Sequence, residues 1–431
     1  MNNPVFLRPA AIALFTLCLL TGLVTAQTCP GGSGCLDETF GYAGISTVPV
    51  YGGASGEGTL QSDGKPVVLM EYAGSVEVIR FDVHGGLDTT FGGGDGIANL
   101  SWAAPGGRYG VPHAVATQQD DGLEKLIVAG WTYVQEGRKL VIGLRVDRLM
   151  PDGSLDTSFG AGGSFIRKAG YARGLAIQPW DQKIVTVGAE PANVTRLMPD
   201  GGFDTSFGSG GIVNATNSVT GYAAVFQPDG KIVVTGSLAA KGQKVNMGVA
   251  RFHANGAIDT GFGMSGKIGI DFGTNSRGRD VELSGDKIVI VGSAGEFASN
   301  DMAVARLTSS GQLDSTFSGD GRITHDFSGQ TDHAWGVAAR LDGRILVVGE
   351  GAGPASPSQR HIAILGFTPS GSFDPLFGTD GIVTTVVPGN SIHGRKIFFQ
   401  NDPMCSCEKL LVVGMMNTPT GAYAVTARYL P

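Results

Sequence analysis

The sequence predicts an all-β protein: a seven-bladed β-propeller with four-stranded antiparallel blades, closed by pairing of the N- and C-terminal segments. Three observations predict this fold. A six-residue motif recurs seven times, short β-branched segments and turns surround each copy, and the two chain ends carry complementary parts of one unit. After the first residues, no stretch keeps the 3.6-residue period of an amphipathic helix.

Each copy of the motif runs from an apolar residue and an Asp to a Phe. The copies are LDETFG (36–41), LDTTFG (87–92), LDTSFG (155–160), FDTSFG (203–208), IDTGFG (258–263), LDSTFS (313–318) and FDPLFG (373–378). We expect the Asp to cap a turn through its carboxylate and the Phe to fill the space between neighbouring blades. Catalysis rarely needs seven copies of a group, so the motif predicts structure.

One unit shows the elements that surround the motif. Residues 221–227 form a short first strand, and the following PDGK is a turn, because Pro and Gly fix its backbone. Residues 232–237 are a β-branched second strand, 247–253 a third, and 267–272 a fourth after the motif. Four strands joined by short turns predict an antiparallel meander, and the other units follow the same plan.

Such meanders bury their apolar faces by packing against one another. An open row would leave the outer face of its first and last units exposed to solvent, whereas a closed ring has no such units. The chain ends favour the ring. The first motif has no preceding strands, whereas the chain finishes on a third strand with no motif after it. We therefore expect residues 36–46 to complete the last blade beside residues 421–430.

The segments QPDGKIVVTG (227–236) and VARFHANGAIDTGFG (249–263) resemble the bacterial delta-sixty-residue repeat family of exported β-propeller proteins. The resemblance extends over nearly all of the chain after the first residues. It implies an exported bacterial propeller, but it carries no catalytic residues and no cofactor.

The first residues are typical of a signal peptide. One Arg precedes an uncharged apolar run, and small residues then stand at a cleavage position between Ala26 and Gln27. We expect residues 1–26 to be the signal peptide and 27–431 a single propeller, secreted or periplasmic, with no membrane span after cleavage. An uncleaved N-terminal anchor is the alternative.

Four cysteines follow the predicted cleavage site: Cys29, Cys35, Cys405 and Cys407. An even number in an exported chain predicts disulfides. We favour bridges between the two termini, which would lock the ring. Local pairing of Cys29 with Cys35 and of Cys405 with Cys407 is the alternative. A zinc site would need a neighbouring His pattern that the sequence lacks, so we predict no metal.

Composition limits the partners. The formal charge is −7 and the sequence has no cluster of Lys and Arg, so nucleic acid is not expected. Catalytic signatures such as His-Glu-x-x-His, Gly-x-Ser-x-Gly and a Walker loop are absent from the sequence. Whether the protein is an enzyme stays open at this stage, and no cofactor is predicted.

One position of the repeat suggests a ligand site. Five residues before the end of each first strand stands a large polar or aromatic residue, in a column we call the mouth column: His113, Arg173, Tyr222, Arg279, Trp335 and Arg395, with Gly56 in the first unit. We expect the column to ring the mouth of the central channel, joined by Asp280, His333 and His393. Arginines suit anions and aromatic rings suit sugars, although polar residues at loop ends could equally be structural.

These residues support two classes of function. The first is an exported binding or scaffold protein whose ligand is a glycan or a protein. The alternative is an extracellular polysaccharide hydrolase or lyase with its site at the channel mouth. Glycosidases commonly need two carboxylates. The column offers Asp280, with Glu282 on the same strand, so we favour binding.

Overall fold

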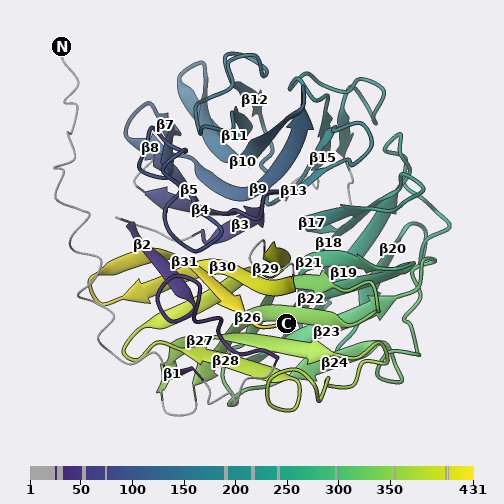
Figure 1. The fold of residues 1–431 in the computed structure, drawn as a ribbon. Helices are drawn as coiled ribbons and strands as arrows, with labels where there is room; N and C mark the ends of the chain where they lie inside the picture. Colours follow the sequence, from purple (N-terminus) through teal and green to yellow (C-terminus); the bar gives the residue numbers. More distant parts are fainter. Residues whose placement is uncertain are drawn as a thin grey trace.

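The computed structural model describes residues 25–26, 33–50, 55–72, 75–188, 193–214, 219–239, 243–296, 299–353, 356–402, 405 and 407–431. These residues form seven four-stranded antiparallel sheets arranged as the blades of a propeller around a central channel (Figure 1), which confirms the predicted fold. Across these ranges the structure contains no helix long and apolar enough to span a membrane.

The blades follow one another along the chain. Their strands are Glu57–Leu60, Pro66–Tyr72, Ser75–Arg80 and Ile97–Ser101 in blade 1 (β3–β6); Val111–Asp120, Leu123–Glu136, Lys139–Leu149 and Ser164–Lys168 in blade 2 (β9–β12); Gly174–Ile177, Ile184–Val187, Asn193–Leu197 and Ile212–Asn214 in blade 3 (β13–β16); Thr220–Phe226, Ile232–Ala239, Val245–Phe252 and Lys267–Ile270 in blade 4 (β17–β20). Blades 5 and 6 are Ser276–Ser284, Lys287–Glu296, Ser299–Leu307 and Arg322–His325 (β21–β24), then His333–Ala339, Ile345–Gly353, Ser356–Phe367 and Ile382–Val386 (β25–β28).

Blade 7 takes strands from both ends of the chain. Its first three strands are Ser391–Asp402, Cys407–Thr418 and Gly421–Tyr429 (β29–β31). The fourth is Ile45–Val50 (β2), which pairs with β31 from Ile45 opposite Ala427 to Val50 opposite Ala422. The predicted closure is therefore present, but its strand begins at residue 45. Residues 36–44 form the motif turn instead, and Leu36 contributes one isolated bridge to Tyr429. Three short strands lie outside this plan. Thr25–Ala26 (β1) pairs with the edge of blade 6, and Ala103–Ala104 (β7) pairs with Arg108–Tyr109 (β8).

The motif has the structural role that the sequence predicts. In blade 3, one carboxylate oxygen of Asp204 accepts hydrogen bonds from the backbone N–H and hydroxyl of Ser206, at 3.1 and 2.6 Å. Phe207 is fully buried. The other carboxylate oxygen binds Arg196, whose Nε lies 2.8 Å away and whose Cζ lies 4.4 Å from the centre of the Phe207 ring.

The arginine was not part of the sequence prediction. Arg196 reaches beyond its own blade, because its Nη1 donates to the carbonyl oxygen of Ala254 in blade 4 at 2.5 Å. We call the residues in this position the interblade arginines: Arg80, Arg148, Arg196, Arg251, Arg306 and Arg428. Each pairs with its motif Asp at 2.7–2.9 Å and lies over its motif Phe. These arginines thus couple six of the seven blades to the next, and blade 6 has Gly366 at this position.

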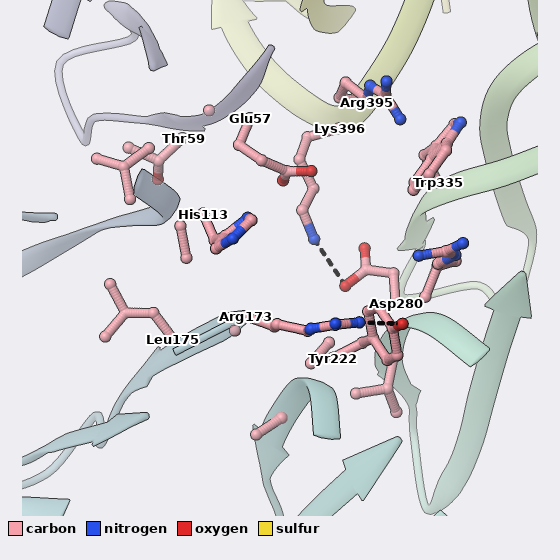
Figure 2. A pocket seen from close by; sticks show the side chains of 18 of the residues that line it. Glu57, Thr59, His113, Arg173, Leu175, Tyr222, Asp280, Trp335, Arg395 and Lys396 are labelled. Carbon is pink, nitrogen blue, oxygen red and sulfur yellow. Dashed lines mark hydrogen bonds and ion pairs between the residues drawn. The ribbon is translucent and has the colours of Figure 1, made fainter. Parts of the chain in front are cut away.

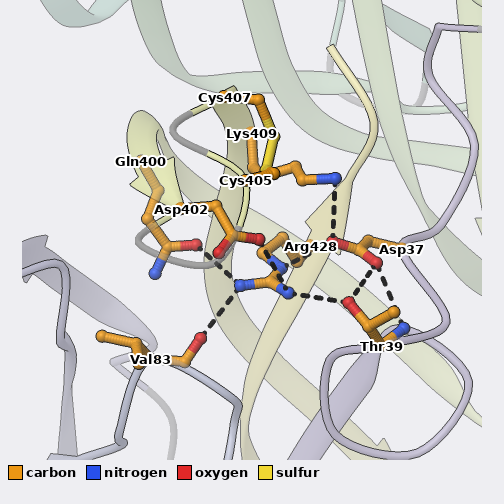
Figure 3. The surroundings of a disulfide bond; sticks show 9 residues. All are labelled: Asp37, Thr39, Val83, Gln400, Asp402, Cys405, Cys407, Lys409 and Arg428. Atoms are coloured by element: carbon orange, nitrogen blue, oxygen red, sulfur yellow. Dashed lines mark hydrogen bonds and ion pairs between the residues drawn. A yellow bond between two sulfur atoms is a disulfide. The ribbon is translucent and has the colours of Figure 1, made fainter.

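At the closing blade the same arrangement joins the two chain ends (Figure 3). Arg428, near the C-terminus, lies 2.9 Å from Asp37 and donates to the carbonyl oxygen of Val83 in blade 1 at 2.9 Å. Lys409 adds a second cation 3.4 Å from Asp37. The ring is therefore closed by strand pairing and by a buried ion pair.

The disulfides differ from the prediction. Cys405 is bonded to Cys407 in the turn between β29 and β30 (Figure 3), where their Cα atoms lie 5.1 Å apart. Cys35 is buried and without a disulfide, although its carbonyl oxygen accepts a hydrogen bond from Leu430 N–H at 2.7 Å. The favoured bridges between the termini are thus wrong for Cys35, Cys405 and Cys407, and the alternative local pairing is confirmed for Cys405 with Cys407. Cys29 and nearly all of the predicted signal peptide (1–24) lie outside the described residues.

Candidate ligand site in the central channel

The first strands of all seven blades surround a cavity of about 1010 Å³ in the middle of the ring (Figure 2). Six of the nine predicted ligand residues lie on its wall as the column predicts, and Asp280 lies there too. These seven are His113, Arg173, Tyr222, Arg279, Asp280, Trp335 and Arg395. His333 and His393 are not on the wall.

A β-bulge turns the mouth column toward the cavity. In blade 5, Gly278 pairs with Gly292 and Asp280 with Val291, so Arg279 is left without a partner residue. Blades 2, 4, 6 and 7 skip His113, Tyr222, Trp335 and Arg395 in the same way. A bulge adds one residue to its strand and re-aims side chains. As a result, Arg279 and the following Asp280 both line the cavity.

A repeated glycine on the second strand makes room for the bulge. A Cβ at Gly292 would overlap the carbonyl oxygen of Arg277, two residues before the bulged Arg279. The same overlap would occur at the corresponding positions of the other bulged blades and of blade 3, which are Gly130, Gly188, Gly236, Gly349 and Gly414. In blade 1 the residues here are Leu69 and Met70, and β3 pairs with β4 without a shift. All five blades with the bulge therefore carry the glycine, and blade 3 carries it as Gly188 although β13 pairs with β14 without a shift.

The column residues form a continuous stack of alternating cations and rings around one side of the channel. The Cζ of Arg279 lies 4.8 Å from the ring centre of Tyr222 and 4.6 Å from that of Trp335. The Cζ of Arg395 lies 3.9 Å from the ring centre of Trp335, and that of Arg173 lies 4.5 Å from that of Tyr222. Such contacts stabilise a guanidinium in a fixed position.

These arginines are not paired with carboxylates in the part of the chain that the structure describes. Arg173 donates to the hydroxyl groups of Tyr171 and Tyr222. The Nε atoms of Arg279 and Arg395 and the Nε1 of Trp335 are buried without a hydrogen-bond partner. Burial lowers the pKa of Arg279, since the desolvated charge is disfavoured. These Nε and Nε1 atoms are enclosed by neighbouring side chains, so an acceptor from a ligand would bind the outer guanidinium N–H groups of Arg279 and Arg395, which line the cavity.

A second set of charges lines the cavity at the position directly after the column. Glu57, Asp280 and Lys396 occupy this position in three blades, and small residues occupy it in the others: Ala114, Gly174, Ala223 and Gly336. We call Glu57, Asp280 and Lys396 the charged tier. Lys396 Nζ lies 2.7 Å from one oxygen of Asp280, whose other oxygen accepts a hydrogen bond from Val337 N–H at 3.2 Å. Figure 2 shows the carboxyl of Glu57 beside Lys396.

The ionisation of this tier is set by burial and by neighbouring charges. Burial opposes the charge on Lys396, but Asp280 and Glu57 outweigh burial and raise its pKa, so the lysine stays protonated. Burial raises the pKa of Glu57, and it raises the pKa of Glu282, further along β21, to about 7. Near neutral pH, Glu282 can therefore take up or release a proton.

The histidines have separate roles. Burial, and then the charge of Arg173, lower the pKa of His113 to about 4, so this cavity residue is neutral at pH 7. His333 and His393 instead hold one buried carboxylate: the Nδ1 of His333 lies 3.0 Å from Glu350, and the Nδ1 of His393 contacts its other oxygen. Burial opposes the ionisation of Glu350, but these two hydrogen bonds outweigh it and hold its pKa well below the usual range.

The sequence prediction missed Glu57 and Lys396. Both stand one residue after the mouth column, at a position that is small in four of the seven repeats. A charged residue at a position that is otherwise Gly or Ala is a signal that an alignment of the repeats could have found. In blade 7 the bulge at Arg395 brings Lys396 to the cavity, whereas Glu57 lines the cavity in blade 1 without a register shift.

Comparisons with known proteins support the fold. A family model described as "Domain of unknown function (DUF5122) beta-propeller" matches residues 119–159, 227–262 and 286–317. No curated protein matches the chain. Among solved structures, Sqt1 of Chaetomium thermophilum is 12% identical with a TM-score of 0.38, over 75% of this chain and 86% of that one.

Two further solved structures are similar to this chain. The tail fibre of Staphylococcus aureus phage P68 is 10% identical with a TM-score of 0.29, over 75% of this chain and 50% of that one. A structure titled glucose dehydrogenase is 12% identical with a TM-score of 0.28, over 59% of this chain and 95% of that one. The matched family model, which covers three segments of three blades, supports a place for the chain among the β-propeller families.

Proposed function

We propose that the protein is an exported binding protein that holds an anionic ligand in its central channel. The observation that carries this proposal is the set of three arginines, Arg173, Arg279 and Arg395, that face one cavity without a carboxylate partner among the described residues. A guanidinium recognises carboxylate and phosphate groups through paired N–H donors. Export rests on the signal-peptide pattern of residues 1–26 and on the resemblance to the delta-sixty-residue repeat family.

The contacts between the channel arginines and the aromatic rings argue against the sugar-stacking role that Trp335 and Tyr222 suggested from the sequence. Trp335 carries two guanidinium groups over its ring, from Arg279 and Arg395, and Tyr222 carries two, from Arg173 and Arg279. The rings are therefore not free platforms for a sugar. They hold the arginines apart and in place, so that the edges of the guanidinium groups are left for a ligand. This arrangement favours an anion over a neutral flat ring.

A hydrolase or lyase acting on an extracellular polysaccharide is the second candidate. The observation that favours it is Glu57, because the cavity now holds three carboxyl groups, and burial raises the pKa of two of them, Glu57 and Glu282. A protonated carboxyl group could act as a general acid. Asp280, however, is paired with Lys396, so no free carboxylate stands opposite that acid. Binding remains the function that the geometry supports best.

Calorimetry with simple anions tests the binding proposal. The purified chain, without residues 1–26, is titrated with sodium acetate and with inorganic phosphate. Arg279→Gln and Arg395→Gln together should weaken binding at least tenfold, since hydrogen bonds to charged groups are each worth about 1.5–3 kcal/mol. Arg138→Gln, which removes the same charge from an exposed turn, is the matched control. Equal binding by the double variant and the control would refute the proposal.

A further inference from the structure

The cavity contains two different recognition surfaces, one above the other along the first strands. The mouth column presents guanidinium edges, and the charged tier follows it by one residue in blades 1, 5 and 7. From this juxtaposition we infer that the ligand is a sugar acid, a saccharide whose carboxylate binds the arginines and whose hydroxyl groups bind Glu57, Asp280 and Lys396. The inference rests on the proposed function and makes its ligand class specific.

The charges of the cavity favour a single carboxylate over a multiply charged anion. Glu57 lies close enough to Arg279 and Arg395 for both arginines to lower its pKa in part, so acids and arginines share one space. A phosphate dianion at the arginines would face repulsion from Glu57 and Asp280. A monoanion at the guanidinium groups of Arg279 and Arg395, which line the cavity, meets less repulsion from these acids.

The charged tier suits hydroxyl groups. Carboxylate oxygens accept hydrogen bonds from hydroxyls and the ammonium of Lys396 donates to them, so donors and acceptors alternate within one small region. Simple anions such as acetate have no group that could use these contacts. A saccharide has several hydroxyls around one ring, and these can both donate and accept hydrogen bonds.

The shape of the cavity leaves room for a ring at this level. Four blades contribute Ala114, Gly174, Ala223 or Gly336 where the other three contribute charged side chains. Gly174 and Ala223, in blades 3 and 4, lie across the ring from Glu57 and Lys396 in blades 1 and 7, whereas Ala114 and Gly336 lie in the blades next to these two. A cavity of about 1010 Å³ is at the upper end of small-ligand sites and accepts more than one sugar ring.

A panel of matched ligands tests the inference by isothermal titration calorimetry. The probes are D-galacturonate, its neutral counterpart D-galactose, acetate and inorganic phosphate. We expect galacturonate to bind at least tenfold more tightly than either galactose or acetate, because each lacks one of the two sets of contacts. Trigalacturonate extends the panel to a longer ligand, for which we expect equal or tighter binding.

Two variants assign the contacts. Glu57→Gln keeps the size of the side chain and should weaken galacturonate several-fold while leaving acetate unchanged. Arg395→Gln should weaken both. Thermal melting and circular dichroism of each variant establish that it is folded.

The outcomes separate the two proposals. If phosphate or acetate binds in an arginine-dependent way but galacturonate binds no more tightly, the sugar-acid inference is wrong and the anion site stands. If no anion binds to the folded protein, both proposals fail. Galactose binding that equals galacturonate binding and does not depend on Arg395 would also overturn both.

Discussion

The interblade arginines and the channel arginines occupy two regions of the molecule and make one contact in common. Both groups place a guanidinium over an aromatic ring, at 4.4 Å for Arg80 over Phe91 and at 4.6 Å for Arg279 over Trp335. Their other partners differ. Arg80 also binds Asp88 at 2.8 Å and the carbonyl of Pro151 in the next blade at 2.7 Å, whereas the Nε of Arg279 is buried without a partner.

The difference shows how a repeat fold separates structure from recognition. An arginine whose donors are all used within the protein stabilises that protein and offers a ligand little. An arginine held in place by rings alone keeps its donors for something else, at some cost in stability. The first kind occurs in six blades, while the mouth column contributes the second kind through Arg279 and Arg395.

The largest expected effect comes from breaking an interblade arginine. Arg428→Leu should lower the free energy of unfolding by about 3–5 kcal/mol, because it leaves Asp37 buried without its main cation. Arg428 also joins the chain ends, so its loss should favour opening of the ring. Arg279→Leu is the matched control in the channel and should change stability little. Urea unfolding of the two variants measures the contrast, which disappears if both lose the same free energy.

The bulge that positions a channel arginine offers the next test. Gly292→Ala adds a methyl group that would overlap the Arg277 carbonyl, so the bulge at Arg279 must shift. We expect a loss of about 1–3 kcal/mol in stability, as for other overpacked sites. Anion binding should weaken as well, because Arg279 moves. Ser293→Ala, at the next residue of β22, is the control. Unchanged calorimetric binding by Gly292→Ala would show that the bulge does not position the site.

The third prediction concerns how much the disulfide between Cys405 and Cys407 contributes to the stability of the closed ring. Because Cys405 and Cys407 close a loop of only a few residues, chain entropy limits their contribution to about 1–2 kcal/mol. Cys405→Ser with Cys407→Ser should therefore lower the melting temperature by only a few degrees. A bridge between the termini, closing about 370 residues, would contribute roughly 6 kcal/mol in the same model. A collapse of stability on reduction would mean that the closure depends on sulfur rather than on Arg428.

The smallest expected effect is the pH dependence of anion binding. Above pH 7 Glu282 is charged and repels an anion in the same cavity, and below pH 7 it is neutral. A bound anion raises the pKa further, so binding takes up a proton and affinity rises as the pH falls from 8 to 6. The gain is up to about tenfold per unit of pKa shift. Glu282→Gln should flatten the profile, with Glu57 contributing what remains. A profile identical to the unchanged protein would exclude this role for Glu282.

The sequence alone determined the number of blades, the course of the strands and the closing partner of the last blade. These features depend on local chemistry repeated along the chain: turn residues, β-branched runs and an Asp that caps its own turn within two residues. It also predicted that the mouth column surrounds the channel, since every first strand has the same orientation in the ring.

The tertiary structure decided which side chains meet. Glu57 and Lys396 are more than 300 residues apart in the chain, and only the closed ring brings blades 1 and 7 together around one cavity. The bulge opposite Gly292 decided that two successive residues face the ligand space, against the alternation of a regular strand. The tertiary structure also decided which cysteines pair. Cys405 and Cys407 lie together at the turn between β29 and β30 and form a disulfide, whereas Cys35 is buried elsewhere, before β2, and stays free.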